Sequence, residues 1–385
     1  MEVANRLQGV GEYYFSQKLR EIEAMNQAGK RVINLGIGSP DLPPHPEVIE
    51  ILQRESNNPA NHAYQSYKGT AALRKSIAGW YQQFYGVKLE PETEILPLMG
   101  SKEGIMHICM TYLNQGDLAL VPNPGYPTYS AAVQLAGGQA VYYDLNDASD
   151  WLPDLAGLEK VDLGRVKLMF INYPHMPTGA LPNATVFSEL VAFAQKHRIL
   201  LVHDNPYSFI LNDQPKSLMA TPGAMEVAVE LNSLSKSHNM AGWRVGMLVG
   251  AKERINDVLK FKSNMDSGMF LPLQLAAARA LQLDAGWHEA VNLQYKKRQA
   301  LVFELLELLE CKYRESQAGM FVWAAIPHRY KDGFALSDDV LANASVFITP
   351  GGIFGSNGNK YVRASLCASE EKIEEAIKRI KNRLT

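Results

Sequence analysis

Short apolar runs recur through the first 250 residues, and amphipathic segments lie between several of them. This alternation constrains the fold most, because buried strands alternating with helices are typical of an α/β domain with a mostly parallel sheet. Helices are expected at 104–113 and 186–197. Strands are expected at 94–100, 117–122, 139–143, 166–172, 199–204, 227–232 and 244–250.

The pattern changes after about residue 270. A long helical segment, 286–310, comes first, and a charged helix, 369–384, closes the chain. Between them lie three segments that have the composition of strands. These strands are expected at 319–326, 344–350 and 360–366.

The two patterns predict a large α/β domain, with helices flanking a mostly parallel sheet, and a smaller α+β domain. The large domain is predicted to span 41–275 and the smaller one 276–385. Residues 1–40 are predicted to form an N-terminal arm and part of the smaller domain, because chain termini often pack together.

The composition excludes several kinds of partner. The formal net charge is −2 and no dense block of lysine or arginine occurs, which argues against nucleic acid or an anionic membrane surface. The N-terminus lacks the pattern of a signal peptide, and no apolar run is long enough to span a membrane. Cys109, Cys311 and Cys367 lie far apart, so we expect reduced cysteines and a cytoplasmic protein.

Five of the apolar runs end in turns rich in polar residues, glycine or proline. In an open α/β sheet, ligands bind beyond the carboxyl ends of the strands, so these turns are expected to converge on one crevice. Their sequences are GSKEG (100–104), NPGYP (123–127), NYPHMPTG (172–179), HDNPY (203–207) and NSLSK (232–236).

Lys236 follows one of these strands. Considered alone, a lysine in a polar turn is most often an exposed charge. Ser233, Ser235 and Arg244 alter that interpretation, because hydroxyls and a guanidinium around one lysine can form a pocket for a dianionic phosphate. A lysine beside such a pocket can bond covalently to a carbonyl cofactor.

Other turns carry further candidates. Asp204 ends an apolar run, where it is either a helix or turn cap or a buried carboxylate that needs a cationic partner. Ser101 and Lys102 open a helix, whose N-terminal N–H groups favour an anion. Tyr126 can stack on a flat ring or pack in the core. The nine histidines form no His-Glu-x-x-His pair, so metal catalysis is not expected.

Together these residues resemble the class I/II aminotransferases, the pyridoxal-phosphate enzymes of fold type I, over nearly the whole chain. The resemblance is nearest to the branch that contains aspartate, alanine and LL-diaminopimelate aminotransferases. The matching motifs are NLGIGSPDLPP (34–44), YQSYKGTAALR (64–74), GSKEG, NPGYP, PTG (177–179), DNPY (204–207), SLSK with GWRVG (233–246) and YVRASL (361–366).

The resemblance implies a cofactor site for pyridoxal 5′-phosphate in the large domain. Lys236 is then the lysine that bonds to the cofactor and moves the substrate's α proton. Asp204 pairs with the ring nitrogen, Tyr207 with the ring's phenolic oxygen, and Tyr126 stacks on the ring. The implied phosphate ligands are Ser101, Lys102, Ser233 and Arg244.

The same resemblance implies how the substrate and a second subunit are bound. Arg363 is expected to clamp the substrate's α-carboxylate, with the backbone of Gly38 nearby and Tyr13 lining the pocket. Tyr64 is expected to reach the phosphate of the neighbouring subunit in a homodimer with shared active sites. Asn264 or Ser267 can also cross that interface.

One position departs from the family. The family reads Asn-Pro-Thr-Gly, and its asparagine donates to the ring's phenolic oxygen, whereas Met176 stands there in this chain. A thioether cannot donate a hydrogen bond. Losing this donor is expected to raise the pKa of the protonated nitrogen that joins Lys236 to the cofactor. Asn172 and His175 are near in sequence, and either is a possible substitute.

The resulting expectation is an aminotransferase that moves an amino group between an amino acid and a 2-keto acid. A carbon–sulfur β-lyase uses the same residues and is the first alternative. A non-catalytic regulator that binds the cofactor is a third possibility, although members of that kind carry an N-terminal DNA-binding domain for which the alignment leaves no room.

Overall fold

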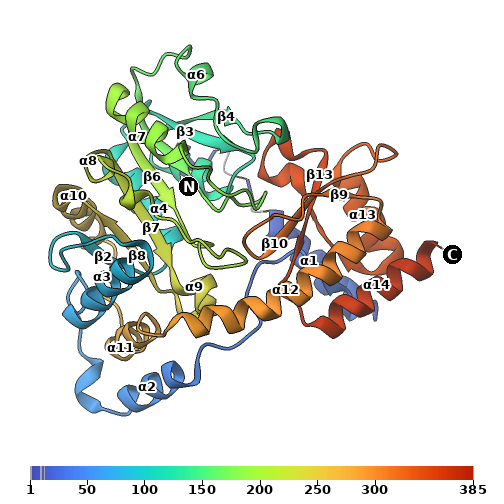
Figure 1. The fold of residues 1–385 in the computed structure, drawn as a ribbon, viewed down its shortest axis with the longest axis horizontal. Helices are drawn as coiled ribbons and strands as arrows, with labels where there is room; N and C mark the ends of the chain where they lie inside the picture. Colours follow the sequence, from blue (N-terminus) through green and yellow to red (C-terminus); the bar gives the residue numbers. More distant parts are fainter. Residues whose placement is uncertain (1, 9–10, 13, 385) are drawn as a thin grey trace.

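A seven-stranded sheet forms the centre of the larger part of the molecule (Figure 1). The computed structural model describes residues 2–8, 11–12 and 14–384. Each of the seven strands predicted before residue 251 is confirmed in this sheet. The strands are β2 (Ile95–Leu98), β3 (Leu118–Asn123), β4 (Gln139–Asp144), β5 (Val166–Ile171), β6 (Leu200–Asp204), β7 (Ala228–Ser233) and β8 (Gly246–Gly250).

The strand order is β2-β8-β7-β6-β5-β3-β4, and all neighbours are parallel except the two pairs that contain β8. The predicted mostly parallel sheet is thus confirmed. Because β8 runs against the others, it begins at the edge where they end. Residues just before β8 therefore lie beside the turns that follow the other strands.

Helices cover both faces of this sheet, because successive residues of each strand point to opposite faces. In β6, Leu201 packs into one apolar cluster and Val202 into the other. The helices α3 (Ala71–Tyr85), α7 (Val186–His197) and α11 (Leu271–Ala280) belong to the first cluster. The second cluster includes α4 (Ser101–Tyr112), α5 (Thr128–Leu135) and α10 (Lys252–Lys262).

Helix α2 (Pro46–Ser56) packs on α11. Among the described residues, no helix is both long and apolar enough to cross a bilayer. The remaining short helices of this part are α6 (Leu155–Leu158), α8 (Ala224–Val227) and α9 (Leu234–Ser237).

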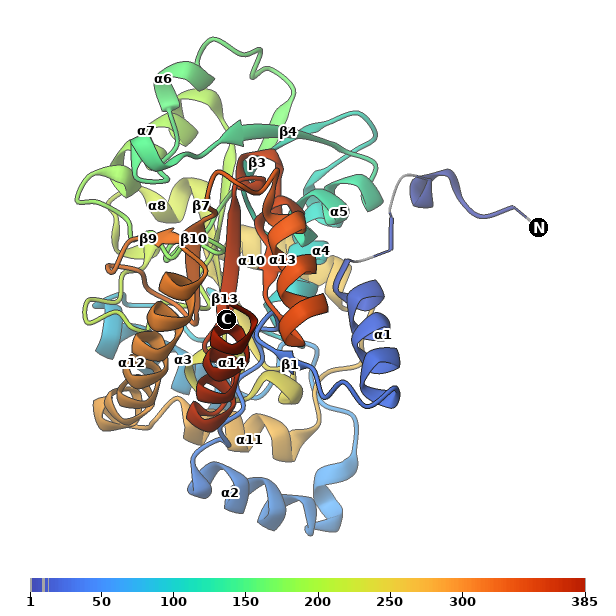
Figure 2. The same ribbon diagram turned by 90° about the vertical axis from the view of Figure 1, so that its right-hand side faces the viewer.

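The C-terminal part contains an antiparallel sheet in the order β12-β13-β10-β9. Its strands are β9 (Lys312–Tyr313), β10 (Phe321–Ala325), β12 (Thr349–Pro350) and β13 (Tyr361–Ser365). The helices α12 and α14 lie side by side against it (Figure 2). The helices of this part are α12 (Ala285–Leu308), α13 (Gly333–Ala344) and α14 (Glu370–Leu384).

The single strand predicted over 344–350 is wrong in one respect, because this segment contains two strands. After β11 (Val346–Phe347) the chain changes partners at Ile348 and continues as β12. Strand β12 pairs with β13, whereas β11 pairs in parallel with a strand from the N-terminal segment.

That N-terminal strand is β1 (Ile33–Asn34), with Ile33 opposite Val346. The helix before it, α1 (Tyr14–Gln27), contributes Ile22 to a small apolar cluster with Leu341 and Phe347. The segment that contains α1 and β1 thus packs on the last hundred residues of the chain (Figure 2). The domain limits at 40/41 and 275/276 remain predictions.

Candidate active site

A cavity of about 570 Å³ lies at the edge where the strands of the large sheet end. A volume of this size suits a small-molecule ligand. Each of the five predicted turns contributes to its wall, so the structure brings these turns together. Their contributions are Ser101, Lys102, Tyr126, Asn172, Met176, Asp204, Tyr207, Ser233, Ser235 and Lys236.

Lys236 lies in α9, directly after β7, and its side chain points into the cavity. Its ammonium donates a hydrogen bond to the backbone oxygen of Gly38. Burial lowers the pKa of the Lys236 amine, and the charges of Arg363 and Arg244 act in the same direction. A neutral amine is the form that attacks a carbonyl, so this environment favours nucleophilic chemistry.

Asp204 ends β6, and its carboxylate is buried in the cavity wall. The hydroxyl of Tyr129 donates to Asp204 Oδ2 over 2.8 Å. The other oxygen, Oδ1, has no hydrogen-bond partner among the described residues. Burial raises the pKa of the Asp204 carboxyl to about 6, although the Tyr129 hydrogen bond and the charge of His203 lower it. This carboxylate is suited to a cationic or N–H partner that a ligand provides.

One corner of the cavity, which we call the cradle, comprises the N-terminus of α4 and the side chains Ser101, Lys102, Ser233, Ser235 and Arg244. Gly100 precedes the helix with φ +92°, and a Cβ atom there would lie 2.1 Å from Arg244 Nη2, so only glycine fits. Arg244 Nη1 donates to Ser235 Oγ over 3.4 Å and to the oxygen of Ala241 over 2.8 Å. A helix N-terminus beside a guanidinium and hydroxyls favours a phosphate group.

Ser233 lines the cavity, and its hydroxyl also makes local hydrogen bonds. Its hydroxyl accepts from the Ser235 backbone N–H over 3.1 Å and lies 2.8 Å from Ser235 Oγ, which caps the short helix that carries Lys236. Ser235 is therefore the hydroxyl that faces Arg244.

Pyridoxal phosphate fits this set of residues. The cradle matches the phosphate, and the unpartnered Asp204 oxygen matches the protonated ring nitrogen. Tyr207 and Tyr126 also line the cavity, and burial raises the pKa of both hydroxyls, which therefore keep their protons and can donate.

Arg363 forms the opposite end of the cavity. It lies in β13 and is 4% exposed, and its Nη2 donates to the oxygen of Gly36 over 2.9 Å. Its guanidinium carbon is 3.7 Å from the centre of the Phe321 ring, which is a cation–π contact. Its Nη1 lies 3.2 Å from the sulfur of Met176. A guanidinium held in this way can bind a carboxylate.

The structure places the two possible substitutes for the missing asparagine. Asn172 lines the cavity, but its amide nitrogen donates to the Asp204 backbone oxygen over 2.5 Å and its oxygen accepts from the Met176 N–H over 2.7 Å. His175 contacts Thr178 through Nδ1 and does not line the cavity. Asn172 thus ties the turn to β6, and His175 cannot replace the donor.

Three described residues that were expected near the ligand do not line this cavity. Tyr64 is 90% exposed, and Asn264 and Ser267 are also exposed. Tyr13 lies outside the described residues. Because three of these side chains were expected to act across a subunit interface, their roles remain predictions.

Some wall residues were missed from the sequence. Tyr129 was missed although it follows Tyr126 by three residues, a spacing that places both on one side of a helix start. Phe321, Phe354 and Phe15 also line the cavity. They come from β10, from a segment near β12 and from α1, and no motif connects these distant segments.

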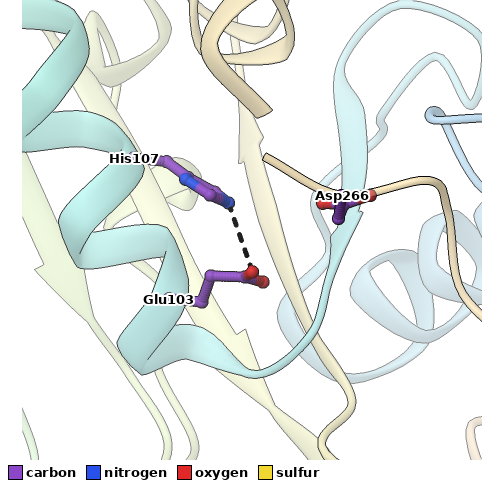
Figure 3. A group of neighbouring side chains, drawn as sticks. All are labelled: Glu103, His107 and Asp266. Carbon is purple, nitrogen blue, oxygen red and sulfur yellow. Dashed lines mark ion pairs between the residues drawn. The ribbon is translucent and has the colours of Figure 1, made fainter. Parts of the chain in front are cut away.

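A second group of polar side chains includes residues of α4 that do not line the cavity (Figure 3). Glu103 and His107 of α4 approach Asp266, with candidate ligand atoms within 4.8 Å of one another. The ammonium of Lys262 lies 2.9 Å from Asp266 Oδ1 and donates to the oxygen of Tyr67. This lysine already supplies a positive charge, so we interpret the group as a structural ion-pair cluster.

The sequence model of aminotransferase class I and II matches residues 30–380. This match covers the described strands and all of the cavity wall except the residues of α1. The chain belongs to the class I and II aminotransferases. Members of this family use pyridoxal phosphate, so the chain is a pyridoxal-phosphate-dependent aminotransferase.

The individual proteins that are similar to this chain are consistent with its assignment to the aminotransferase family. The chain is 38% identical to an LL-diaminopimelate aminotransferase of Dehalococcoides mccartyi and 40% identical to one of Halothermothrix orenii. These alignments cover 99% of this chain and 99% and 98% of the relatives. The solved structure of apo-BacF from Bacillus subtilis is 38% identical, with a TM-score of 0.94 over 99% of this chain and 98% of BacF. The fold type I architecture is thus confirmed.

Proposed function

We propose that transamination in this chain depends on Lys236 and Asp204 at one end of the cavity and on Arg363 at the other. The observation that carries this proposal is the buried, unpartnered oxygen of Asp204 in the same cavity as a lysine whose pKa is lowered. When bound, the cofactor withdraws electrons from the substrate's α carbon and carries the amino group between the two half-reactions.

Lys236 anchors the cofactor through its amine and, once the substrate amine has displaced it, moves the proton from the α carbon. Its hydrogen bond to the Gly38 oxygen keeps the amine on the substrate side of the cavity. The lowered pKa leaves a larger fraction of neutral amine at pH 7, and this is the form that accepts a proton.

With the cofactor bound, Asp204 would hold the ring nitrogen in its protonated state through its oxygen Oδ1, while Tyr129 fixes Oδ2. Tyr207 would donate to the phenolic oxygen of the ring, and Tyr126 would stack on the ring. The phosphate is held by the cradle, which comprises the N-terminus of α4 and the side chains Ser101, Lys102, Ser233, Ser235 and Arg244.

Arg363 binds the α-carboxylate of the substrate, and the aromatic rings around it set the side-chain preference. Phe15, Phe321 and Phe354 line this end together with Ile37 and Leu19. No carboxylate lines this end of the cavity among the described residues. The preferred donor is therefore an amino acid with an apolar side chain, whose transfer to this wall is favoured by the hydrophobic effect.

The test is a set of half-reactions followed by absorbance. Phenylalanine and leucine are compared with glutamate and with LL-diaminopimelate, the substrate in the names of the relatives. We expect the apolar donors to convert the bound cofactor to its amine form at least about ten times faster. Faster conversion by LL-diaminopimelate would contradict the proposed donor class but not transamination itself.

We further propose a cytoplasmic homodimer in which Tyr64 completes the neighbouring subunit's phosphate site. The 90% exposure of its side chain in the single chain supports this role. Tyr64→Phe and Lys236→Ala subunits are mixed and allowed to exchange. A hybrid dimer contains one intact site, because the Lys236→Ala subunit supplies the tyrosine. Activity above that of both parents is expected, and its absence contradicts the shared site.

The named relatives are aminotransferases, so the comparisons do not favour the carbon–sulfur β-lyase or the regulator. Product analysis separates the three activities. Transamination leaves the amine form of the cofactor and a keto acid, whereas a lyase releases pyruvate and a thiol from a suitable thioether substrate. A regulator converts none of the donors.

A further inference from the structure

A buried histidine and a buried glutamate lie side by side behind the cofactor end of the cavity. His203 is the residue before Asp204 in β6, and it is opposite Glu230 of β7 in the register of the sheet. Both side chains are fully buried. The arrangement is not part of the transamination machinery described so far.

Glu230 is surrounded by hydrogen-bond donors. Its Oε1 accepts from the hydroxyl of Tyr81 over 2.9 Å, and its Oε2 accepts from the backbone N–H of Leu218 over 2.9 Å. The Ser217 hydroxyl lies 2.9 Å from both oxygens. Hydrogen bonds from donors stabilise the ionised form of a carboxylate relative to its protonated form.

The ring of His203 lies between two acceptors. Its Nε2 is 3.1 Å from the backbone oxygen of Tyr173, and a carbonyl can only accept, so Nε2 carries a proton. Its Nδ1 is 2.8 Å from Glu230 Oε2. Because that oxygen already accepts from Leu218, Nδ1 is placed to donate to it, and a ring that donates through both nitrogens is an imidazolium.

This ion pair is placed to act on Asp204. Successive residues of a strand point to opposite faces of the sheet, so the imidazolium lies behind the carboxylate of Asp204. The positive charge of His203 lowers the pKa of Asp204, whereas burial raises it. The His203–Tyr173 and Asn172–Asp204 hydrogen bonds also tie the turn that carries Met176 to β6.

We propose that His203 is a positioning residue, a buried imidazolium paired with Glu230 that keeps Asp204 ionised for the cofactor's ring nitrogen. This inference rests on the proposed role of Asp204. The pair is held by hydrogen bonds on every side, which is what makes a buried charge tolerable. The other titratable groups that face it are Tyr81 and Tyr85 of α3.

The first measurement determines the protonation state of the two ring nitrogens of His203. Nitrogen NMR of protein labelled at histidine, compared with His203→Gln protein, assigns the His203 signals at pH 7.5. Two protonated ring nitrogens are expected. A neutral tautomer overturns the proposal, whatever the activity of the enzyme.

The second measurement is the pH dependence of pyridoxal-phosphate uptake by the apo protein. The double variant His203→Gln/Glu230→Gln removes both charges, so it leaves no uncompensated buried ion. Without the imidazolium, the pKa of Asp204 rises. As the pH is lowered, the carboxyl is therefore protonated, and uptake of the cofactor is lost, at a higher pH than in the wild type. The midpoint is expected to move up by at least about half a pH unit.

Tyr81→Phe is the matched control, because it removes one donor to Glu230 without changing any charge. Its midpoint is expected to stay within about 0.2 of the wild-type value. An unchanged midpoint in the double variant, or an equal shift in Tyr81→Phe, overturns the proposal.

Asp204→Asn separates this proposal from the proposed function. If uptake weakens in Asp204→Asn while the double variant behaves as wild type, only the role of His203 fails. If Asp204→Asn takes up the cofactor as wild type does, the role of Asp204 fails and that of His203 fails with it.

Discussion

The two ends of the cavity are built in different ways. At the cofactor end, which comprises the turns after β2, β3, β5, β6 and β7 and the residues just before β8, polar groups are fixed by hydrogen bonds. At the substrate end, Arg363 lies on aromatic rings and beside a thioether. The contrast indicates that the chemistry common to the family depends on polar groups fixed in place by hydrogen bonds. Selection of the substrate's side chain depends instead on an apolar wall that can vary.

The largest effect is expected for the lysine of the cofactor end. Lys236→Ala removes the covalent anchor and the group that moves the α proton. Turnover is expected to fall by at least about 10⁴-fold in steady-state assays. Lys260→Ala is the control, because that side chain is exposed and distant in the sequence. Retained turnover in Lys236→Ala would refute the assignment of the cofactor end.

A change at the substrate end is expected to leave the cofactor in place. Arg363→Lys keeps the charge but cannot form the bidentate pair of hydrogen bonds that an arginine makes with a carboxylate. The value of kcat/KM for the amino donor is expected to fall by about 100-fold, mainly through KM. Cofactor affinity, measured by absorbance titration, should be unchanged. A comparable loss of cofactor affinity would show that the two ends are not separable.

A substitution at Asp204 tests whether this buried carboxylate destabilises the protein when the cofactor is absent. The pKa of its carboxyl is about 6 in the folded protein and 3.8 ordinarily, so its contribution to stability is greatest below pH 3.8 and is lost as pH rises through 6. At pH 8 the apo Asp204→Asn protein is therefore expected to be more stable than wild type by about 2 kcal/mol.

Urea unfolding at several pH values measures this difference. The advantage of Asp204→Asn should shrink as pH falls from 7 towards 4, because the native carboxyl becomes protonated. A difference that does not depend on pH would mean that the buried carboxylate carries no such cost.

The smallest effect is expected at Met176, which lies in a turn of the cofactor end and contacts Arg363 of the substrate end. Met176→Asn restores the donor typical of the family, which should lower the pKa of the nitrogen that joins Lys236 to the cofactor by about 0.5. Spectrophotometric titration of the holoenzyme measures that pKa. Met176→Leu is the control, because it changes neither charge nor donors. A wild-type value equal to or below that of Met176→Asn would contradict this expectation.

The cofactor end could be predicted from the sequence because each of its parts is a turn directly after an apolar run. Asp204 and Lys236 end or follow strands of one parallel sheet, and such ends must share an edge. The substrate end could not be predicted in this way. Its wall forms only when β1 pairs with β11 and when β13 pairs with β12 and β10, which brings together Phe15, Phe321 and Phe354. Apolar residues in short strands do not reveal such long-range partners.

His203 illustrates a second limit. In the sequence it is one histidine in a buried strand, and its protonation depends on Glu230, Ser217 and Leu218, which approach from other segments. The Arg363–Met176 contact is similar, because the absence of the family's asparagine is visible in the sequence but the position of the sulfur is not.

The pairing of β1 with β11 has a consequence for how the protein is made. The hydroxyl of Thr349 donates to the oxygen of Gly36 across 313 residues of sequence, next to the glycine loop that receives the lysine's hydrogen bond. On the ribosome, the N-terminal segment emerges long before its partner strand is synthesised. The substrate end of the pocket therefore assembles only after β11, β12 and β13 have been synthesised, so a nascent chain can collapse around its central sheet before it can select a substrate.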